Sequence, residues 1–213
     1  TFRVGGPADI LVQPKGTELA AVIRLCREYD VPYQVIGNGS NLLVGDRGIR
    51  GLVIEMLSKE DEICVEDDCI TVGAGMLLSK TANRAAEHGL TGMEFAAGIP
   101  GRIGGAVVMN AGAYGGEMKD ILTAVTVLDQ EGNEKILSAE ELELGYRTSC
   151  ILKKGYIVTG AKIKLKHGEE TAIRARMEEL KKQRVEKQPL EYPSAGSTFK
   201  RPEGYFAGKL IMD

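Results

Sequence analysis

The chain has 213 residues and a formal net charge of −3, with 43% hydrophobic and 27% charged residues, as in a globular protein with a buried core. This balance excludes the concentrated basic face of a nucleic-acid-binding protein, and without a signal peptide or a run of about 18 apolar residues we expect no membrane partner. Four scattered cysteines (Cys26, Cys64, Cys69 and Cys150) and two isolated histidines predict no metal site and favour reduced thiols in a cytoplasmic protein.

The first part of the chain predicts a small α/β unit. Residues 1–6 are strand-like, and the apolar residues of 17–29 recur at helical spacing, with Thr17 as the N-cap. Strands are expected at 33–37 and 51–56. A strand, a helix and a strand within such a short segment are typical of an α/β fold.

The middle of the chain predicts mostly β-structure. A helix is expected at 77–88, ended by Gly89, and the segment 130–133 is a hairpin turn signal. Ser138 and Glu141 have the spacing of a capping box, which predicts a short helix there. Strands are expected at 62–66, 69–75, 123–129, 134–138 and 156–166.

The last part predicts a long charged helix at 169–187, followed by a loop rich in proline and glycine. The basic run 181–184 lies among glutamates, which indicates a solvated helix face. The chain begins without Met, and 207–213 is typical of the first turn of an apolar helix. We therefore expect both ends to be internal to a longer protein.

A first glycine-rich segment, VIGNGSNLLVG (35–45), follows a predicted strand. Glycines there let backbone N–H groups converge on an anion, to which Ser40 and Asn41 can add donors. The segment is neither a Walker A loop nor G-x-G-x-x-G, because Leu42 replaces the third glycine. Taken alone, a tight turn between strands is the simpler interpretation.

A second segment, AGIPGRIGGAVVMNAGAYGGEM (97–118), holds seven glycines. Glycine inside regular structure costs about 0.5–1 kcal/mol relative to alanine, so the repetition indicates that something approaches the backbone closely. A planar ring or a diphosphate fits, and a buried loop packed on a neighbouring strand is the alternative. Two such segments in one chain favour a large cofactor.

Two further segments hold candidate catalytic side chains. Arg147, next to Tyr146 in a predicted loop, can bind a carboxylate with two donors, although an isolated arginine is more often a surface ion-pair partner. Ser197 follows Gly196, where a serine usually bonds to its own turn. With only two histidines, a serine-hydrolase triad is not expected.

Together these segments resemble the UDP-N-acetylenolpyruvoylglucosamine reductase (MurB) family. Five motifs occur in the order of the family and span nearly the whole chain, which is more specific than any one of them. The motifs are TFRVGGPAD (1–9), IGNGSNLLV (36–44), GMEFAAGIPGRIGGAVVMNAGAYGGEM (92–118), GYRTS (145–149) and PSAGSTFKRP (193–202).

The resemblance implies an α+β fold in which two α/β subdomains, 1–55 and 56–167, form an FAD-binding module of the PCMH or vanillyl-alcohol-oxidase type. Residues 168–213 are expected to begin a substrate-binding domain. In the family NADPH reduces the bound FAD, which then gives hydride to the enolpyruvyl group of UDP-N-acetylglucosamine enolpyruvate. The product is UDP-N-acetylmuramate, a precursor of peptidoglycan.

The resemblance also implies residue roles. Arg147 is expected to bind and polarise the substrate carboxylate, Ser197 to donate a proton, and Tyr146 and Lys187 to contact the substrate. Residues expected to bind the cofactor are Gly37, Asn38, Gly39, Ser40, Asn41, Gly98, Ile99, Pro100, Gly104, Gly105, Asn110, Ala111, Gly112, Ala113, Tyr114 and Gly115.

The chain departs from the family pattern in two ways. The family has a further C-terminal region with a catalytic glutamate, and this chain stops at Asp213, so we expect residues 1–213 alone to be inactive. Arg201 stands where some members have Asn.

Two other functions remain open. One is an FAD-linked oxidase of the same fold, many of which attach FAD to a histidine. His88 and His167 lie outside both glycine-rich segments, which argues against it. The other is a non-catalytic flavin- or nucleotide-binding module.

Overall fold

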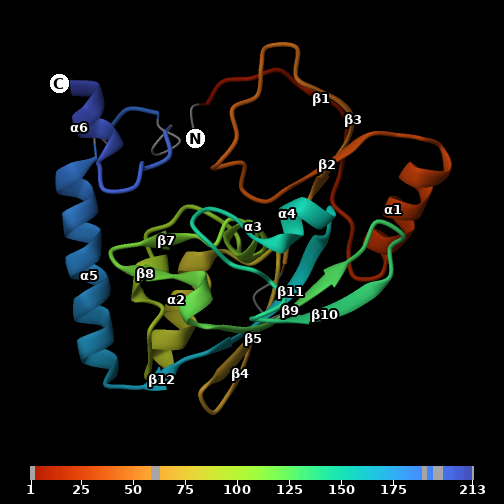
Figure 1. The fold of residues 1–213 in the computed structure, drawn as a ribbon. Helices are drawn as coiled ribbons and strands as arrows, with labels where there is room; N and C mark the ends of the chain where they lie inside the picture. Colours follow the sequence, from red (N-terminus) through yellow and green to blue (C-terminus); the bar gives the residue numbers. More distant parts are fainter. Residues whose placement is uncertain (1–2, 59–62, 189–190, 194–198, 213) are drawn as a thin grey trace.

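The computed structural model describes residues 3–58, 63–188, 191–193 and 199–212. Helices surround two main β-sheets, one three-stranded and one five-stranded (Figure 1). This confirms the α+β fold. The strands of the first sheet lie within residues 8–55 and those of the second within residues 63–164. The division of the chain into domains 1–55, 56–167 and 168–213 stays a prediction.

The first sheet is parallel and has the order β1-β3-β2. Its strands are β1 (Ala8–Val12), β2 (Tyr33–Ile36) and β3 (Ile49–Glu55), and α1 (Glu18–Glu28) connects the first two. The crossover helix and the two later strands were predicted from the periodicity of the sequence, whereas β1 was not.

The expected strand at residues 1–6 is wrong for the residues that the structure describes. Gly5 has a φ of 120°, Pro7 has no backbone N–H to donate, and the first strand begins at Ala8. Thr17 does occupy the N-cap position of α1, but its side chain makes no capping hydrogen bond. Instead, the carboxylate of Glu18 accepts the N–H of Lys15 at 2.7 Å.

The second sheet is antiparallel and has the order β10-β9-β11-β5-β4. All five strands were predicted, and the hairpin of β9 and β10 was predicted from its turn. The strands are β4 (Ile63–Glu66), β5 (Cys69–Gly73), β9 (Leu122–Leu128), β10 (Glu134–Ser138) and β11 (Ile157–Lys164).

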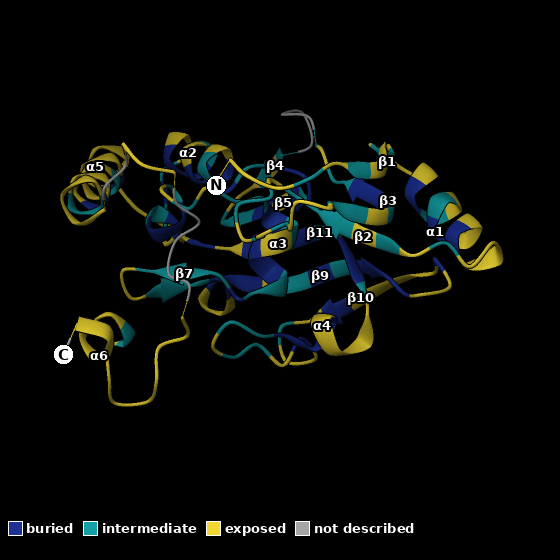
Figure 2. Ribbon diagram, turned by 90° about the horizontal axis from the view of Figure 1, so that it is seen from above, coloured by how far each residue is buried: buried dark blue, intermediate teal, exposed yellow. Residues whose placement is uncertain are grey.

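The main hydrophobic core lies between this sheet and the helices α2 (Leu78–Glu87) and α3 (Ile103–Val108), as the buried surfaces in Figure 2 show. Helix α3 was not expected, because glycines occupy two of its six positions. The shorter elements are β6 (Leu90–Thr91), η2 (Glu94–Ala96), β7 (Gly112–Ala113), β8 (Gly116–Glu117), η3 (Met118–Asp120), α4 (Cys150–Lys154), β12 (Lys166–His167) and α6 (Ala207–Met212).

A second, smaller core joins the two sheets. Leu19 and Ile23 of α1 pack in one buried cluster with Leu128 of β9 and Ile157 of β11. Outside this cluster, Arg24 of α1 donates to the carbonyl oxygen of Gly132, in the turn between β9 and β10, at 3.1 Å. The first α/β unit is therefore held firmly against the second sheet.

The capping-box pair behaves differently from the prediction. The N–H of Ser138 donates to the Glu141 carboxylate at 2.8 Å, and the N–H of Glu141 approaches Ser138 Oγ at 3.3 Å. The residues that follow form turns and no helix. Glu143 adopts a φ of 48°, which ends any helical run after a single turn.

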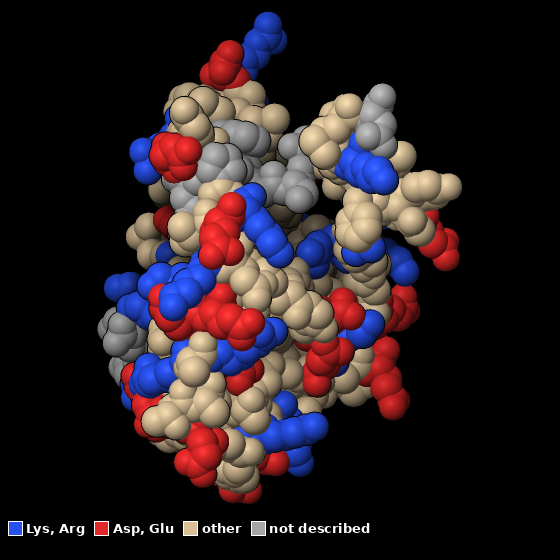
Figure 3. Space-filling view, turned by 90° about the vertical axis from the view of Figure 1, so that its left-hand side faces the viewer, with Lys and Arg blue, Asp and Glu red and all other residues tan. Residues whose placement is uncertain are grey.

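The long charged helix α5 (Glu170–Lys187) was predicted correctly. It buries Ile173 and Leu180 toward α2 and η2. Basic and acidic side chains alternate over the face of the molecule that carries α5 (Figure 3), which agrees with a solvated surface. Among the described residues, no helix combines the length and the apolarity that a membrane span requires.

Candidate functional site

The two glycine-rich segments meet in the structure. The side-chain amide of Asn38 donates to the carbonyl oxygen of Pro100 at 3.0 Å. A Cβ atom on Gly37 would lie 3.3 Å from the Cβ of Arg102. The turn after β2 and the segment before α3, which are far apart in the sequence, therefore form one continuous surface.

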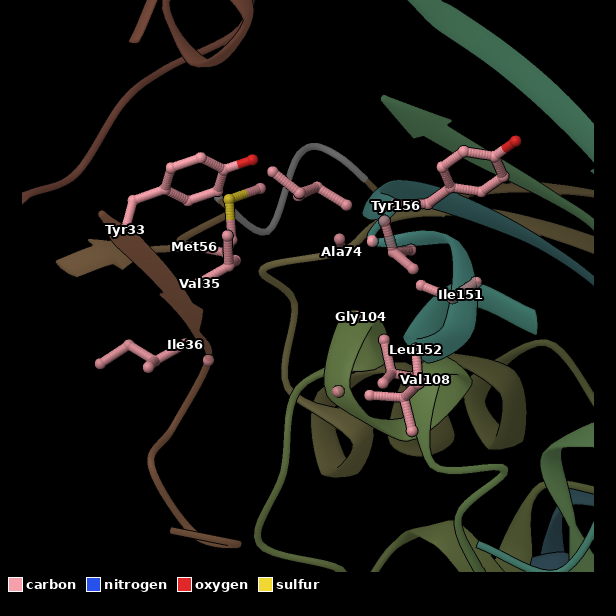
Figure 4. Close-up of a pocket in the computed structure, with 15 residues that line it drawn as sticks. Tyr33, Val35, Ile36, Met56, Ala74, Gly104, Val108, Ile151, Leu152 and Tyr156 are labelled. Atoms are coloured by element: carbon pink, nitrogen blue, oxygen red, sulfur yellow. The ribbon is translucent and has the colours of Figure 1, made fainter. Parts of the chain in front are cut away.

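A cavity of about 270 Å³ opens beside this junction, between the first sheet and the helices α3 and α4. Figure 4 shows Tyr33, Val35 and Met56 on one side of it and Ile151, Leu152 and Tyr156 on the other. Its floor includes the bare backbone of Gly104 and Gly105. An apolar slot with aromatic side chains and glycines suits a planar ring system.

Burial raises the pKa of the Tyr33 phenol, and the nearby Cys26 raises it further. A tyrosine phenol is already uncharged at neutral pH, and the raised pKa extends this neutrality to more alkaline pH. An uncharged side chain here avoids the large desolvation cost that a charged side chain would have when a bound ring system covers it.

The glycines of the two segments fall into two groups. In the first group, neighbouring residues leave too little room for a side chain. A Cβ added to Gly104 would lie 3.1 Å from the Cβ of Ala74, and one added to Gly112 would lie 2.7 Å from the Cβ of Glu117. Others have no heavy atom within 4 Å of an added Cβ, and these are Gly39, Gly45, Gly105 and Gly115. Close packing on protein neighbours therefore accounts for the first group, while the approach of a cofactor to the second group stays a prediction; Gly39 and Gly115 also have φ values of 60° and 87°, which favour glycine.

Arg102 lies at the junction and has unused bonding capacity. One guanidinium nitrogen, Nη1, donates to the carbonyl oxygen of Gly75 at 2.5 Å. Its Nε is the one buried side-chain nitrogen or oxygen, among the residues that the structure describes, with no hydrogen-bond partner. A positive side chain with an unpaired buried donor favours an anionic group nearby.

Arg147 lies against the second glycine-rich segment. Its guanidinium donates to the carbonyl oxygens of Asn110 at 3.3 Å and of Gly112 at 2.9 Å, and lies 5.3 Å from the ring centre of Tyr146. Its φ of 55° is in the left-handed region, which is uncommon for a residue other than glycine. The loop is thus held in a strained conformation, as functional residues often are.

Asn110 fixes this loop. Its side-chain amide donates to the Glu117 carboxylate at 2.8 Å and to the carbonyl oxygen of Gly145 at 3.0 Å, and its Oδ1 accepts the N–H of Lys119 at 2.9 Å. Because Asn110 is fully buried and both ends of its side chain are bonded, it positions the Arg147 loop rather than offering a free donor.

Of the expected substrate contacts, Tyr146 lies beside Arg147. Tyr146 is half-exposed, and its hydroxyl accepts the N–H of Arg201 at 3.4 Å. Lys187 is exposed and ends α5. Ser197, the expected proton donor, lies outside the described residues.

Sequence reasoning missed two arginines of this region, Arg102 and Arg184. Arg184 was assigned to a solvated basic face, whereas its guanidinium donates to the carbonyl oxygen of Gly98. The available signal was its spacing three residues before Lys187, which places both side chains on similar faces of one helix.

Comparison with known proteins agrees with this geometry. Residues 8–138 match the model of a family described as an FAD binding domain. The class of protein that the fold and the cavity define is therefore an FAD-binding protein.

Relatives are similar over the whole chain. The chain is 56% identical to the UDP-N-acetylenolpyruvoylglucosamine reductase of Clostridium perfringens strain SM101 over 213 residues, covering all of this chain and 70% of the relative. It is 57% identical to that of Clostridium tetani, covering 69% of the relative. The crystal structure of UDP-N-acetylenolpyruvylglucosamine reductase (MurB) from Thermus caldophilus superimposes with a TM-score of 0.83 at 42% identity, over 99% of this chain and 74% of that one. The chain belongs to the UDP-N-acetylenolpyruvoylglucosamine reductase family.

Proposed function

We infer that the function of this protein is that of its family, the NADPH-dependent reduction, through FAD, of UDP-N-acetylglucosamine enolpyruvate to UDP-N-acetylmuramate in peptidoglycan synthesis. The observation that carries this function is the apolar cavity where the two glycine-rich segments meet, in a chain with close relatives of this activity. Neither His88 nor His167 lines the cavity, so histidine-linked flavin attachment has no support.

The residues at the junction fit FAD. The cavity between Tyr33 and Tyr156 suits a planar ring, and Arg102 has an unpaired buried donor beside the turn that would receive a diphosphate. Within that turn, Gly39 leaves open space for an approaching group. We assign the diphosphate to residues 37–41, and the remaining cofactor contacts to residues 98–100, 104–105 and 111–115, among which Gly105 and Gly115 are open.

When bound, FAD supplies the redox chemistry by accepting hydride from NADPH and delivering it to the enolpyruvyl carbon. The protein's share of that step is electrostatic. Hydride addition to one alkene carbon of the substrate leaves negative charge on its neighbour and on the carboxylate. Arg147, held by Asn110 and Gly112, provides a fixed positive charge for that negative charge.

The remaining roles follow the family motifs. Ser197 donates the proton that completes the reduced carbon, since a carbanionic centre is basic enough to take a proton from a well-placed hydroxyl. Tyr146 and Lys187 contact the substrate, Tyr146 beside Arg147 and Lys187 at the end of α5. The variant Ser197→Ala tests the first of these assignments.

We place the reaction in the cytoplasm, with the nucleotide sugar as a small-molecule partner and with neither nucleic acid nor membrane. All four cysteine thiols are free, which agrees with a reducing compartment. The mixed charge over the α5 face also differs from a nucleic-acid-binding surface.

The test is an absorbance titration of the purified whole gene product with NADPH, with and without the UDP-enolpyruvyl sugar. We expect a yellow protein, bleaching by NADPH, and continuous NADPH oxidation only when the sugar is supplied. A colourless protein that cannot be reconstituted with FAD contradicts the function. Bleaching without sugar-dependent turnover supports instead a flavoprotein with another acceptor.

A further inference from the structure

Arg184 joins the last turn of α5 to the second glycine-rich segment (97–118). Its Nη1 donates to the carbonyl oxygen of Gly98, although the two residues are 86 positions apart. Its Nε donates to the side-chain oxygen of Gln188 at 3.2 Å, and the N–H of Gln188 bonds back to the Arg184 carbonyl oxygen at 3.0 Å. The guanidinium is thus oriented by its own helix end.

The contact leaves little room for a side chain at residue 98. An added Cβ would lie 3.1 Å from Nη1 of Arg184 and 3.5 Å from its Cδ. The first distance is tighter than most Cβ contacts and the second is ordinary van der Waals contact, so a side chain at position 98 would require Nη1 of Arg184 to shift by a few tenths of an ångström.

The other end of the same short segment is bonded to the body of the protein. The carbonyl oxygen of Pro100 accepts the amide of Asn38, and that of Gly101 accepts the N–H of Leu78 at 3.0 Å. The segment 98–101 is therefore held on one side by α5 and on the other by the turn after β2.

Helix α5 is itself well anchored. Ile173 and Leu180 are buried on the side that faces η2 and α2. Its last residue, three positions after Arg184, is Lys187. A single arginine thus connects the helix end that carries Lys187 to the backbone expected to lie along the cofactor.

We propose that Arg184 is a positioning residue. It fixes the 98–101 segment for FAD binding and holds the end of α5 that carries Lys187 in a constant position relative to that segment. This rests on the proposed FAD and UDP-sugar function. Without the bond, the segment becomes ordered only when FAD binds, and this entropy cost reduces the free energy of FAD binding. The end of α5 is then also free to move relative to the flavin site.

The experiment compares Arg184→Ala, Arg184→Lys and the control Arg174→Ala in the whole gene product. Arg174 lies on the same helix, and both arginines line a second cavity of about 370 Å³ beside α5, but Arg174 forms a surface ion pair with Glu170 instead of bonding to the 98–101 segment. The measurements are FAD affinity of the apoprotein, the visible absorption bands of the bound flavin, and KM for the UDP-sugar beside kcat. Thermal unfolding of the apoprotein shows that each variant folds.

We expect Arg184→Ala to bind FAD about tenfold more weakly, to shift the flavin bands, and to raise KM more than it lowers kcat. Arg184→Lys, which can still donate to Gly98, should recover most of the affinity, and Arg174→Ala should resemble the wild type. Gly98→Ala displaces the same contact, so combining it with Arg184→Ala should add little further loss.

Two outcomes overturn the proposal. One is a wild-type FAD affinity and spectrum in Arg184→Ala. The other is full additivity of Gly98→Ala and Arg184→Ala. Failure of the wild-type protein to bind FAD contradicts the proposed function instead, and is seen before any variant is made.

Discussion

The side-chain amide of Asn38 donates to the carbonyl oxygen of Pro100 at 3.0 Å and so joins two loops that lie 62 residues apart. Asn38 belongs to the turn after β2, and Pro100 to the segment before α3. Each loop is rich in glycine, and neither could keep its shape from its own side chains. The bond makes them one surface beside the cavity.

Asn38→Ala should therefore weaken FAD binding about threefold to tenfold, which corresponds to one exposed hydrogen bond. The fold should survive, because Asn38 is exposed. Isothermal titration of the apoprotein with FAD measures the change. Gln13→Ala, which removes a surface bond to Glu55 and leaves the contact between Asn38 and Pro100 intact, is the matched control and should bind FAD normally.

Gly104 and Gly105 are neighbours in α3 with opposite surroundings. Ala at position 105 meets no atom within 4 Å, so Gly105→Ala should stabilise the apoprotein by about 0.5–1 kcal/mol while weakening FAD binding. Ala at position 104 meets Ala74, so Gly104→Ala should cost stability, by about 1–3 kcal/mol. Chemical denaturation without FAD measures both variants. Unchanged FAD affinity in Gly105→Ala would remove Gly105 from the cofactor site.

Ser197→Ala tests the proton donor. Because a proton is needed only when the sugar is reduced, reduction of the enzyme by NADPH should stay near the wild-type rate. The sugar-dependent half-reaction should slow by about a hundredfold to ten-thousandfold. Stopped-flow absorbance separates the two half-reactions, and equal slowing of both indicates that Ser197 has a structural role.

Acid sensitivity should depend on Asp129, at the turn between β9 and β10. Its carboxylate accepts the backbone N–H of Asn133 at 2.9 Å and contacts Lys135 Nζ at 3.1 Å, and these donors lower its pKa to about 2 despite burial. A lowered folded-state pKa stabilises the protein above the ordinary value of 3.8, and this stability is lost as the pH falls toward about 2.

Asp129→Asn removes this titration. Its unfolding midpoint should be lower than that of the wild type at neutral pH, and it should fall less steeply between about pH 4 and pH 2. Thermal unfolding at a series of pH values measures both slopes. Parallel curves for the two proteins would show that other carboxylates control the acid transition.

The fold was predictable where the periodicity was long and regular. The spacing of Leu19, Ile23 and Cys26 predicted α1, and the alternation along 156–166 predicted β11. Helix α3 was missed because its glycines hide the helical spacing of Ile103 and Val107, both of which are buried. The turn after Ser138 formed the expected capping bonds, yet such local bonds do not decide whether a helix continues.

The site was predictable only as a set of segments. Gly104 and Gly105 are indistinguishable in the sequence, and only the three-dimensional neighbour Ala74 separates a packing glycine from an open one. Arg184 resembles any arginine on a charged helix until its contact with Gly98 is seen. Such assignments depend on which distant residues meet.

The apolar cluster of Leu19, Ile23, Leu128 and Ile157 joins the two main sheets. Bound flavin can report whether this packing has formed. The cavity has walls from both main sheets, so it forms only after the two sheets have folded and docked. Retained yellow colour in a purified variant therefore certifies that this docking has taken place, before any activity is measured. In a library of variants, colour alone would sort assembled molecules from misassembled ones.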